Sequence, residues 1–413
     1  MSKTQHPIAL WAAVISGTVV TSVLSFSLFV EPPVDRFGDP ANYTRIYSVP
    51  EVERWGSHPV DFYVANVLAS MTLEQKIRSL IIANHPGTDP ASLHAFVQDN
   101  ELGGFIVMGS NVPETSIELA GETSAIAGSP ELPRLIGIDE EGGLIKRLPY
   151  DDFAGADTLR NEPASATYSA FTGRGELLSS VGVNLNFGVV ADVSSDPQSF
   201  IYGRSFGGDP TSVAERVTAA VTGEGTSVLS TIKHFPGHGS APGDSHVGVP
   251  LSPLTFDQWL ASDAIPFQAG IDAGTSMVMF GHLAFPAVDN TPSSLSKTWH
   301  QILRDNLGFS GVIITDDMTM LEQSHLPEYS DRVNNAVLAL AAGNDVLLYV
   351  PGTDFDAGAI VSGVVSAVNA GQISSAQLDD SVRRVLTLRR MLYPEAESWI
   401  PPCDERCFIL VTY

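Results

Sequence analysis

Short runs of apolar residues, rich in Val and Ile, recur along most of this chain and limit what it can fold into. Stretches long enough for a helix separate most of them, and this alternation predicts a parallel β-sheet covered by helices. The runs are residues 79–83, 104–107, 135–138, 183–187, 228–232, 276–280, 312–314 and 346–350. Eight strand–helix repeats favour an α/β fold of the (β/α)8 barrel (TIM barrel) type. Periodicity alone leaves a doubly wound sheet open.

Length and charge narrow the class of protein further. The chain has 413 residues, 44% of them hydrophobic, which is enough for a large core. It carries 22 Lys and Arg against 47 Asp and Glu, a net charge of −25. Because we find no basic run, we expect no nucleic-acid partner. We expect a monomer.

The N-terminus carries a targeting segment. Residues 8–30 contain no charged side chain. A membrane-spanning helix needs about 20 apolar residues, whereas the apolar region of a signal peptide usually has about 7–15. The length favours a membrane anchor over a cleaved signal, and both stay open. Lys3 before the segment and Glu31 after it predict an extracytoplasmic body.

These features predict four parts of the chain. We assign residues 1–30 to the anchor or signal, 31–57 to an extracytoplasmic linker, 58–393 to the barrel and 394–413 to a C-terminal tail. The tail holds both cysteines, Cys403 and Cys407. In an exported protein they favour a small disulfide loop, with two inert thiols as the alternative.

Polar and titratable residues follow several of the predicted strands. They are Asp139, Glu140 and Glu141, then Lys233 and His234, then His282, and finally Asp316 and Asp317. In a barrel the carboxyl ends of the strands surround one pocket, so these side chains are expected to meet there. Helix caps and salt bridges are the alternative for any single position.

The segment "KHFPGHGSAPGDSH" (233–246) crowds titratable groups into a stretch rich in Gly and Pro. A metal site would use His234, His238, Asp244 and His246, but Pro236 between the first two histidines argues against the helix that an HxxxH pair needs. We expect no metal, and without a following GK[ST] we expect no phosphate cradle. A mobile catalytic loop fits better, because Asp244 and His246 share one face of an extended segment.

Several motifs together resemble the bacterial β-N-acetylglucosaminidases of glycoside hydrolase family 3, the β-N-acetylhexosaminidases of the peptidoglycan-recycling type. They are KHFPGHG with DSH, MTLEQKI (71–77), IGIDEEGGLIKRL (136–148), GVNLNFGVVADV (182–193), YGRSFGGDP (202–210), VMFGHLAFPAVD (278–289), GFSGVIITDDMTM (308–320) and AGNDVLLYV (342–350). The resemblance covers about residues 58–393. FGVVADV departs from the family's usual Ala-Pro strand, and Met108-Gly109 departs from its usual strand end.

The resemblance implies a retaining exo-glycosidase that forms a covalent glycosyl-enzyme and needs no cofactor. It implies that Asp316 is the nucleophile and that His246 is the acid/base with Asp244 as its partner. The residues it implies for holding N-acetylglucosamine are Asp139, Arg147, Arg204, Lys233 and His234. The expected substrate is a carbohydrate, most specifically a peptidoglycan fragment.

Alternative functions stay open. A phosphorylase on the same scaffold would use phosphate in place of water, and a sugar- or cell-wall-binding protein would use no chemistry. A substrate-assisted hexosaminidase would use Asp139 and Glu140, leaving Asp316 without a role. We expect Asp192 to be structural, and His282 to be either a pocket wall or a core histidine.

Overall fold

The computed structural model describes residues 59–351 and 354–393. Its main sheet is a closed barrel of eight strands in the order β1-β10-β9-β8-β7-β6-β5-β2. All neighbouring strands of the barrel are parallel. The closed barrel confirms the predicted (β/α)8 fold and excludes the doubly wound sheet.

Each predicted apolar run contributes a strand. The strands are β1 (Ile81–Ala83), β2 (Gly104–Val107), β5 (Leu135–Ile138), β6 (Leu185–Val190), β7 (Leu229–Phe235), β8 (Met277–Phe280), β9 (Val312–Asp317) and β10 (Val346–Tyr349). Three strands, β6, β7 and β9, run further than expected, so that Lys233 and His234 lie inside β7 and Asp316 lies inside β9. A hairpin of β3 (Gly128–Ser129) and β4 (Leu132–Pro133) precedes β5.

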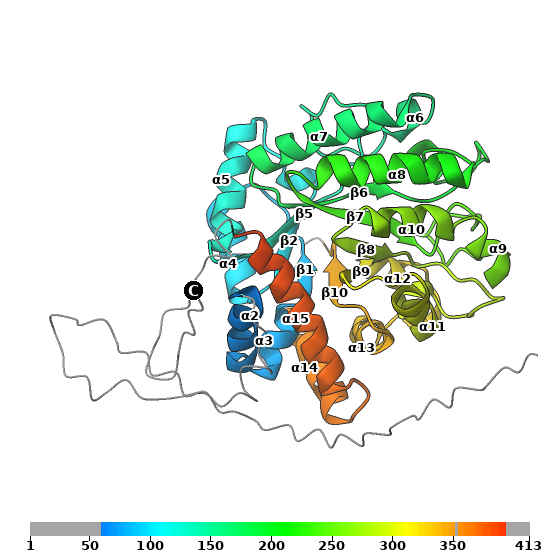
Figure 1. Cartoon of the computed structure of the whole chain (residues 1–413). Coiled ribbons are helices and arrows are strands. Elements are labelled where there is room, and N and C mark those ends of the chain that lie inside the picture. Colours follow the sequence, from blue (N-terminus) through cyan, green and yellow to red (C-terminus); the bar gives the residue numbers. More distant parts are fainter. Residues whose placement is uncertain (1–58, 352–353, 394–413) are drawn as a thin grey trace, which may run out of the picture. The chain divides into compact units, whose positions relative to one another are not determined.

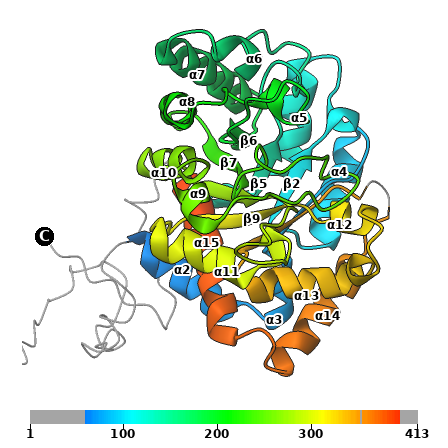
Figure 2. The same cartoon turned by 90° about the vertical axis from the view of Figure 1, so that its right-hand side faces the viewer.

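Helices surround the barrel (Figures 1 and 2). The longer ones are α2 (Pro59–Ser70), α4 (Pro90–Asp99), α5 (Ser116–Ile126), α7 (Ala164–Ser180), α8 (Pro210–Glu224), α10 (Ala264–Asp272), α13 (Arg332–Ala342), α14 (Ala357–Asn369) and α15 (Ser375–Met391). The shorter ones are α3 (Leu73–Arg78), α6 (Ala156–Leu159), α9 (Phe256–Leu260), α11 (Lys297–Gln301) and α12 (Thr319–Gln323). A π-helix, η5 (Ile302–Asn306), continues α11, and 3-10 turns cover η2 (Gly109–Asn111), η3 (Tyr202–Arg204), η4 (Ser293–Leu295) and η6 (Pro327–Tyr329).

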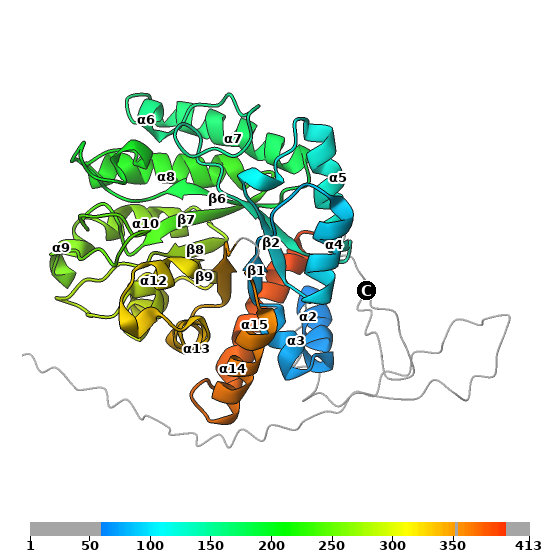
Figure 3. The ribbon, with the colours of Figure 1, turned by 180° about the vertical axis from the view of Figure 1, so that it is seen from behind.

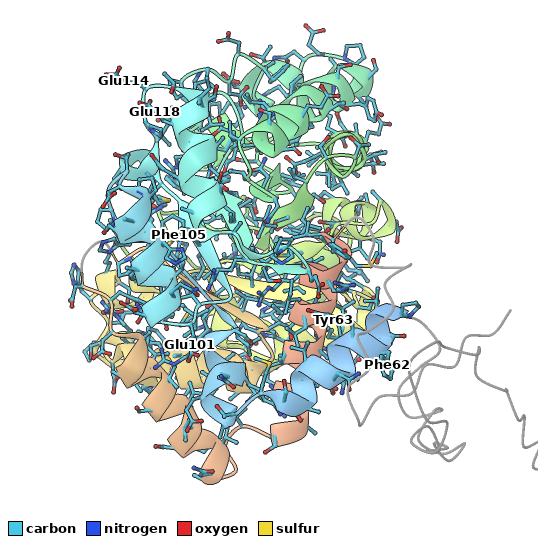
Figure 4. The ribbon with its side chains drawn as sticks, turned by 90° about the vertical axis from the view of Figure 1, so that its left-hand side faces the viewer. Phe62, Tyr63, Glu101, Phe105, Glu114 and Glu118 are labelled. Atoms are coloured by element: carbon cyan, nitrogen blue, oxygen red, sulfur yellow. The ribbon has the colours of Figure 1, made fainter. Side chains whose placement is uncertain are left out.

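Local signals in the sequence explain where several helices begin. Thr115 caps α5 through a capping box with Glu118, which Figure 4 labels near the end of that helix. Such reciprocal bonds satisfy backbone N–H groups that the first turn leaves unpaired. Asp209 caps α8 and is followed by Pro210, whose fixed φ suits the first helical position.

The last two helices close the fold against the first two. α15 packs on α2, and α14 packs on α3, as Figures 1 and 3 show. At this contact the guanidinium of Arg390 lies 4.1 Å from the ring centre of Tyr63, a side chain that Figure 4 labels on α2 beside α15. The stacking joins segments more than 300 residues apart and fixes where the barrel closes.

The predicted anchor, linker and C-terminal tail lie outside the described residues. Within residues 59–351 and 354–393, no helix is both long enough and apolar enough to cross a membrane. The proposed boundaries and the Cys403–Cys407 disulfide therefore stay predictions.

Candidate active site

A buried cluster of opposite charges forms where β5 and β7 end. The ammonium of Lys233 donates to Asp139 at 2.8 Å and forms a salt bridge with Glu141 at 2.7 Å. Glu141 also accepts two bonds from Arg204, at 2.9 and 2.7 Å. Arg147 completes the cluster with a longer contact of 3.4 Å to Asp139. The two carboxylates balance cations that would be costly to bury alone.

The pKa values of this cluster reflect the pairing. Burial alone would raise the pKa of Asp139, but Lys233 and Arg147 lower it to about 2. Burial would lower the pKa of Lys233, but Asp139 and Glu141 raise it above its usual value. At neutral pH both partners are therefore charged, and they present fixed donors and acceptors.

The two glycines after Glu141 shape the loop that carries this cluster. Gly142 has a φ of +78°, and a Cβ there would lie 2.2 Å from the guanidinium of Arg174. Arg174 is itself fixed by a fully buried salt bridge to Asp151 at 2.7 Å. The loop then turns back so that Glu140 accepts the backbone N–H of Arg147 at 2.7 Å. The sequence D-E-E-G-G thus places its first and third carboxylates toward β7 and uses the second one to hold the loop.

His234 lies between the charged cluster and a buried aspartate. Its Nδ1 is 2.7 Å from Asp192, and its Nε2 is 3.1 Å from the guanidinium of Arg204. Asp192 is fully buried and also accepts the backbone N–H of His238 at 2.6 Å. This position agrees with the structural role expected for Asp192, because its oxygens are taken up by backbone and imidazole donors.

Asp316 lies at the end of β9 with its charge stabilised. Burial would raise its pKa, but the imidazoles of His234 and His282, the backbone N–H of Asp317 and the ammonium of Lys233 together hold it below the usual value. The Asp317 N–H bond to the carboxylate measures 2.8 Å. The neighbouring Asp317 points elsewhere and caps the next turn through Thr319 at 2.6 Å. The pKa values of the two adjacent aspartates therefore shift in opposite directions: that of Asp316 is lowered, and burial raises that of Asp317.

His282 packs behind this aspartate pair. Its Nδ1 lies 2.7 Å from the hydroxyl of Ser294, and its Nε2 lies 3.0 Å from the backbone carbonyl of Asp317. It is 1% exposed, and burial lowers its pKa. Both ring nitrogens therefore have hydrogen-bond partners within the protein, which favours a core histidine over a pocket wall.

Asp244 and His246 pair with each other, but they do so within a turn and not in the extended segment that their spacing predicts. The Nδ1 of His246 is 2.7 Å from Asp244, and the side chains are 55% and 38% exposed. This pair lies on the segment after β7, outside the buried cluster. It reaches that cluster through the ring of Phe200, which contacts His246 and lies beneath the guanidinium of Arg204.

The structure therefore brings together Asp139, Arg147, Arg204, Lys233 and His234 with Asp316 close to them, and it presents the Asp244–His246 pair beside them. Sequence reasoning gave no role to Glu141 or Phe200. The motif D-x-E-G-G contains Glu141 and could have pointed to it. No motif singles out Phe200.

Other features of the described residues do not extend this site. No group of three or more His, Cys, Asp or Glu side chains within residues 59–351 and 354–393 could hold a metal ion. A cavity of about 570 Å³ lies near the start of β5 rather than at the strand ends, and its lining includes Arg134, Arg389 and His94.

Comparison with known proteins agrees with this geometry. The glycosyl hydrolase family 3 N-terminal domain matches residues 72–388. The β-hexosaminidase LpqI of Mycobacterium tuberculosis is 32% identical over 340 residues, which are 79% of this chain and 84% of LpqI. An uncharacterized secreted glycosyl hydrolase of Arthroderma benhamiae is 30% identical over 326 residues, 76% of this chain and 92% of that protein.

A solved structure is similar over the same region. The family 3 β-N-acetylglucosaminidase of a Paenibacillus species superposes with a TM-score of 0.72 and 31% identity, covering 83% of this chain and 66% of that one. Sequence and fold therefore point to the same group of enzymes. The chain belongs to glycosyl hydrolase family 3.

Proposed function

We propose that this glycoside hydrolase removes terminal β-linked N-acetylglucosamine with retention of anomeric configuration. The observation that carries the proposal is the ionised Asp316 beside a cluster of fixed charges, with an Asp–His pair adjacent. A retaining glycosidase needs a nucleophilic carboxylate and an acid/base on the other side of the scissile bond. Here His246 would take the place of the second carboxylate.

In this proposal Asp316 attacks the anomeric carbon and forms a covalent glycosyl-enzyme. Its lowered pKa keeps it ionised and ready to attack. His246 protonates the departing oxygen and later removes a proton from the incoming water. Because Asp244 accepts from Nδ1, the Nε2 atom is the one that carries the transferred proton. Asp244 also stabilises the imidazolium form.

The charged cluster would hold the sugar. Asp139 accepts from hydroxyl groups, while Arg204 and Lys233 donate to oxygens. Arg147 and His234 line the same region and complete the set of residues implied by the resemblance. Because Glu141 joins Lys233 to Arg204, we assign it the role of fixing both cations.

We propose that the natural substrate is a peptidoglycan fragment. The relatives named above are a β-hexosaminidase and a secreted glycosyl hydrolase. Together with the charge-free segment 8–30, this supports an extracytoplasmic enzyme, anchored or secreted. Peptidoglycan offers such an enzyme N-acetylglucosamine that is β-linked to N-acetylmuramic acid.

A phosphorylase is the second candidate, because neutral imidazole repels an incoming phosphate less than a carboxylate would.

One experiment distinguishes the hydrolase from the phosphorylase. The purified protein is given an aryl β-N-acetylglucosaminide or the matching β-glucoside, with and without inorganic phosphate, and the first product is identified by NMR. We expect N-acetylglucosamine of β configuration, a rate unaffected by phosphate, and little turnover of the glucoside. An α-configured first product would contradict retention, and N-acetylglucosamine 1-phosphate would establish the phosphorylase.

A further inference from the structure

The segment that carries the Asp244–His246 pair contains little regular structure. Its hydrogen bonds within residues 243–248 are local, such as the 3.2 Å bond from the Val247 N–H to the Asp244 carbonyl. The backbone N–H of His246 is likewise satisfied by Asp244, at 2.9 Å. The pair is therefore built within the segment, and its position over the barrel depends on other contacts.

One such contact is between rings. Phe200 lies on the segment after β6, and its ring centre is 5.4 Å from that of His246, edge to face at 65°. The same ring lies 5.6 Å from the ring of His238 and 5.6 Å from the guanidinium carbon of Arg204. A single side chain thus contacts the pair, the base of its segment and the charged cluster.

The second contact is polar and buried. Ser245, between the two members of the pair, is 3% exposed, and its hydroxyl lies 3.1 Å from Nε2 of His238. His238 is fixed in turn through its backbone N–H, which donates to Asp192 at 2.6 Å. The residue next to His246 is therefore attached to the same aspartate that orients His234.

We propose that Phe200 and the His238–Ser245 bond form a two-point clasp that positions His246 over the site. They are positioning residues, because they act through His246 and not on the substrate. This inference rests on the proposed acid/base role of His246. The clasp would hold Nε2 where the leaving oxygen departs, so its loss would weaken proton donation while leaving the sugar-binding cluster intact.

The test uses aryl β-N-acetylglucosaminides of similar size whose phenols differ in pKa. Proton donation matters more as the leaving phenol becomes less acidic, so the loss of kcat/KM in Phe200→Ala should grow along the series. We expect less than about twofold loss for the most acidic phenol and about tenfold or more for the least acidic, a part of the 10²–10⁴-fold typical of general acid catalysis. Ser245→Ala should follow the same trend, and Phe200→Tyr should restore the wild-type slope.

The matched control is Phe153→Ala, another partly exposed phenylalanine, which is 38% exposed and packs against Gly173 on α7. It should leave the slope unchanged. An equal loss across the whole series in Phe200→Ala, or no loss in both Phe200→Ala and Ser245→Ala, would overturn the clasp. His246→Ala in the same series separates the two claims. If that variant shows the slope and the clasp variants do not, only the clasp is wrong; if it shows none, the acid/base assignment fails first.

Discussion

Asp316 is a half-buried carboxylate whose ionisation depends on the groups around it. Replacing it with Asn keeps its size and its bond from the Asp317 N–H but removes the negative charge. We expect Asp316→Asn to lower kcat for an aryl β-N-acetylglucosaminide by about 10³-fold or more, because an amide is a poor nucleophile at carbon. Steady-state kinetics measures the loss, and circular dichroism with thermal unfolding checks that the barrel is folded. Near-normal turnover in a folded variant would rule out the assignment.

In the proposed mechanism His246 protonates the leaving group, so we expect its replacement to have a different kinetic signature. His246→Ala should slow substrates with poor leaving groups about 10²–10⁴-fold and activated aryl substrates far less. With the activated substrates, hydrolysis of the glycosyl-enzyme should become limiting, since that step needs the same imidazole as a base.

Added azide should then raise the rate of His246→Ala, because a small anionic nucleophile needs no base. Asp244→Ala should show the same pattern more weakly, since it removes only the partner of Nδ1. Equal slowing of all substrates, with no response to azide, would make His246 a structural residue.

For individual residues, the sequence predicts which residue types form the site better than it predicts their contacts. Asp139 and Lys233 were expected to meet, since both lie at strand ends, and the structure places them 2.8 Å apart. The sequence places Glu141 among the carboxylates at the strand ends, but its bridge between Lys233 and Arg204 depends on the folded positions of both cations. Phe200 could not be predicted either, because its contact with His246 joins two irregular segments after different strands.

Among the elements, the strands were the most predictable part. Each apolar run forms a strand because side chains fill the inside of a parallel barrel and helices cover its outside. Water is therefore excluded from both faces of the sheet. The sequence could not give the ends of β7 and β9, which continue through Lys233 and Asp316. Lys233 remains in β7 because Asp139 and Glu141 balance its charge, and these partners meet only in the folded barrel. The carboxylate of Asp316 accepts the N–H of Asp317.

A buried aspartate at the start of β10 ties several elements together. Asp345 is 0% exposed and accepts bonds from Arg304 of η5 at 2.7 Å, Arg384 of α15 at 2.8 Å and Ser381 of α15 at 2.7 Å. We expect Asp345→Asn to lower the free energy of unfolding by about 3 kcal/mol, because it leaves two partly buried cations without their counter-charge. Denaturation in urea measures the change.

The control variant replaces a residue of α15, the helix that carries Arg384 and Ser381. Asp380 pairs with Arg383, and both side chains are more than half exposed. Asp380→Asn should change stability by less than about 1 kcal/mol, as is usual for exposed ion pairs. Equal losses in the two variants would show that Asp345 does not act as a hub.

In the folded molecule, several buried carboxyl groups hold their protons to a higher pH than carboxyl groups ordinarily do. Burial raises the pKa of Glu224 to about 8, although the Asn186 amide, Arg174 and Lys233 oppose the rise. Burial also raises the pKa of Glu140 to about 8 and that of Asp263 to about 7. Between the ordinary carboxyl pKa and these values, the folded protein binds protons that the unfolded chain releases.

The stability that these carboxyl groups contribute should therefore fall as pH rises from about 5 to 8. Below the ordinary histidine pKa of 6.5, His238, His282 and His300 act in the opposite direction, because burial lowers their pKa values. The contribution of Glu224 is fully present below its ordinary pKa of 4.5 and is lost as pH approaches about 8. Glu224→Gln imitates the protonated acid, so it should flatten this fall by up to about 1.4 kcal/mol per pH unit. Urea denaturation at several pH values measures the slope. Glu215→Gln, exposed on the same helix, should leave it unchanged. A slope unaltered in Glu224→Gln would mean that this carboxyl is ionised in the folded protein.

Direct labelling tests whether Asp316 forms a covalent bond to the sugar. The protein is incubated with a fluorinated N-acetylglucosaminide whose glycosyl-enzyme hydrolyses slowly, then digested and mapped by mass spectrometry. We expect one sugar per chain, attached to the peptide that contains Asp316, and no labelling of Asp316→Asn. A label on Asp139 or Glu140, or full inactivation without any covalent adduct, would contradict this expectation.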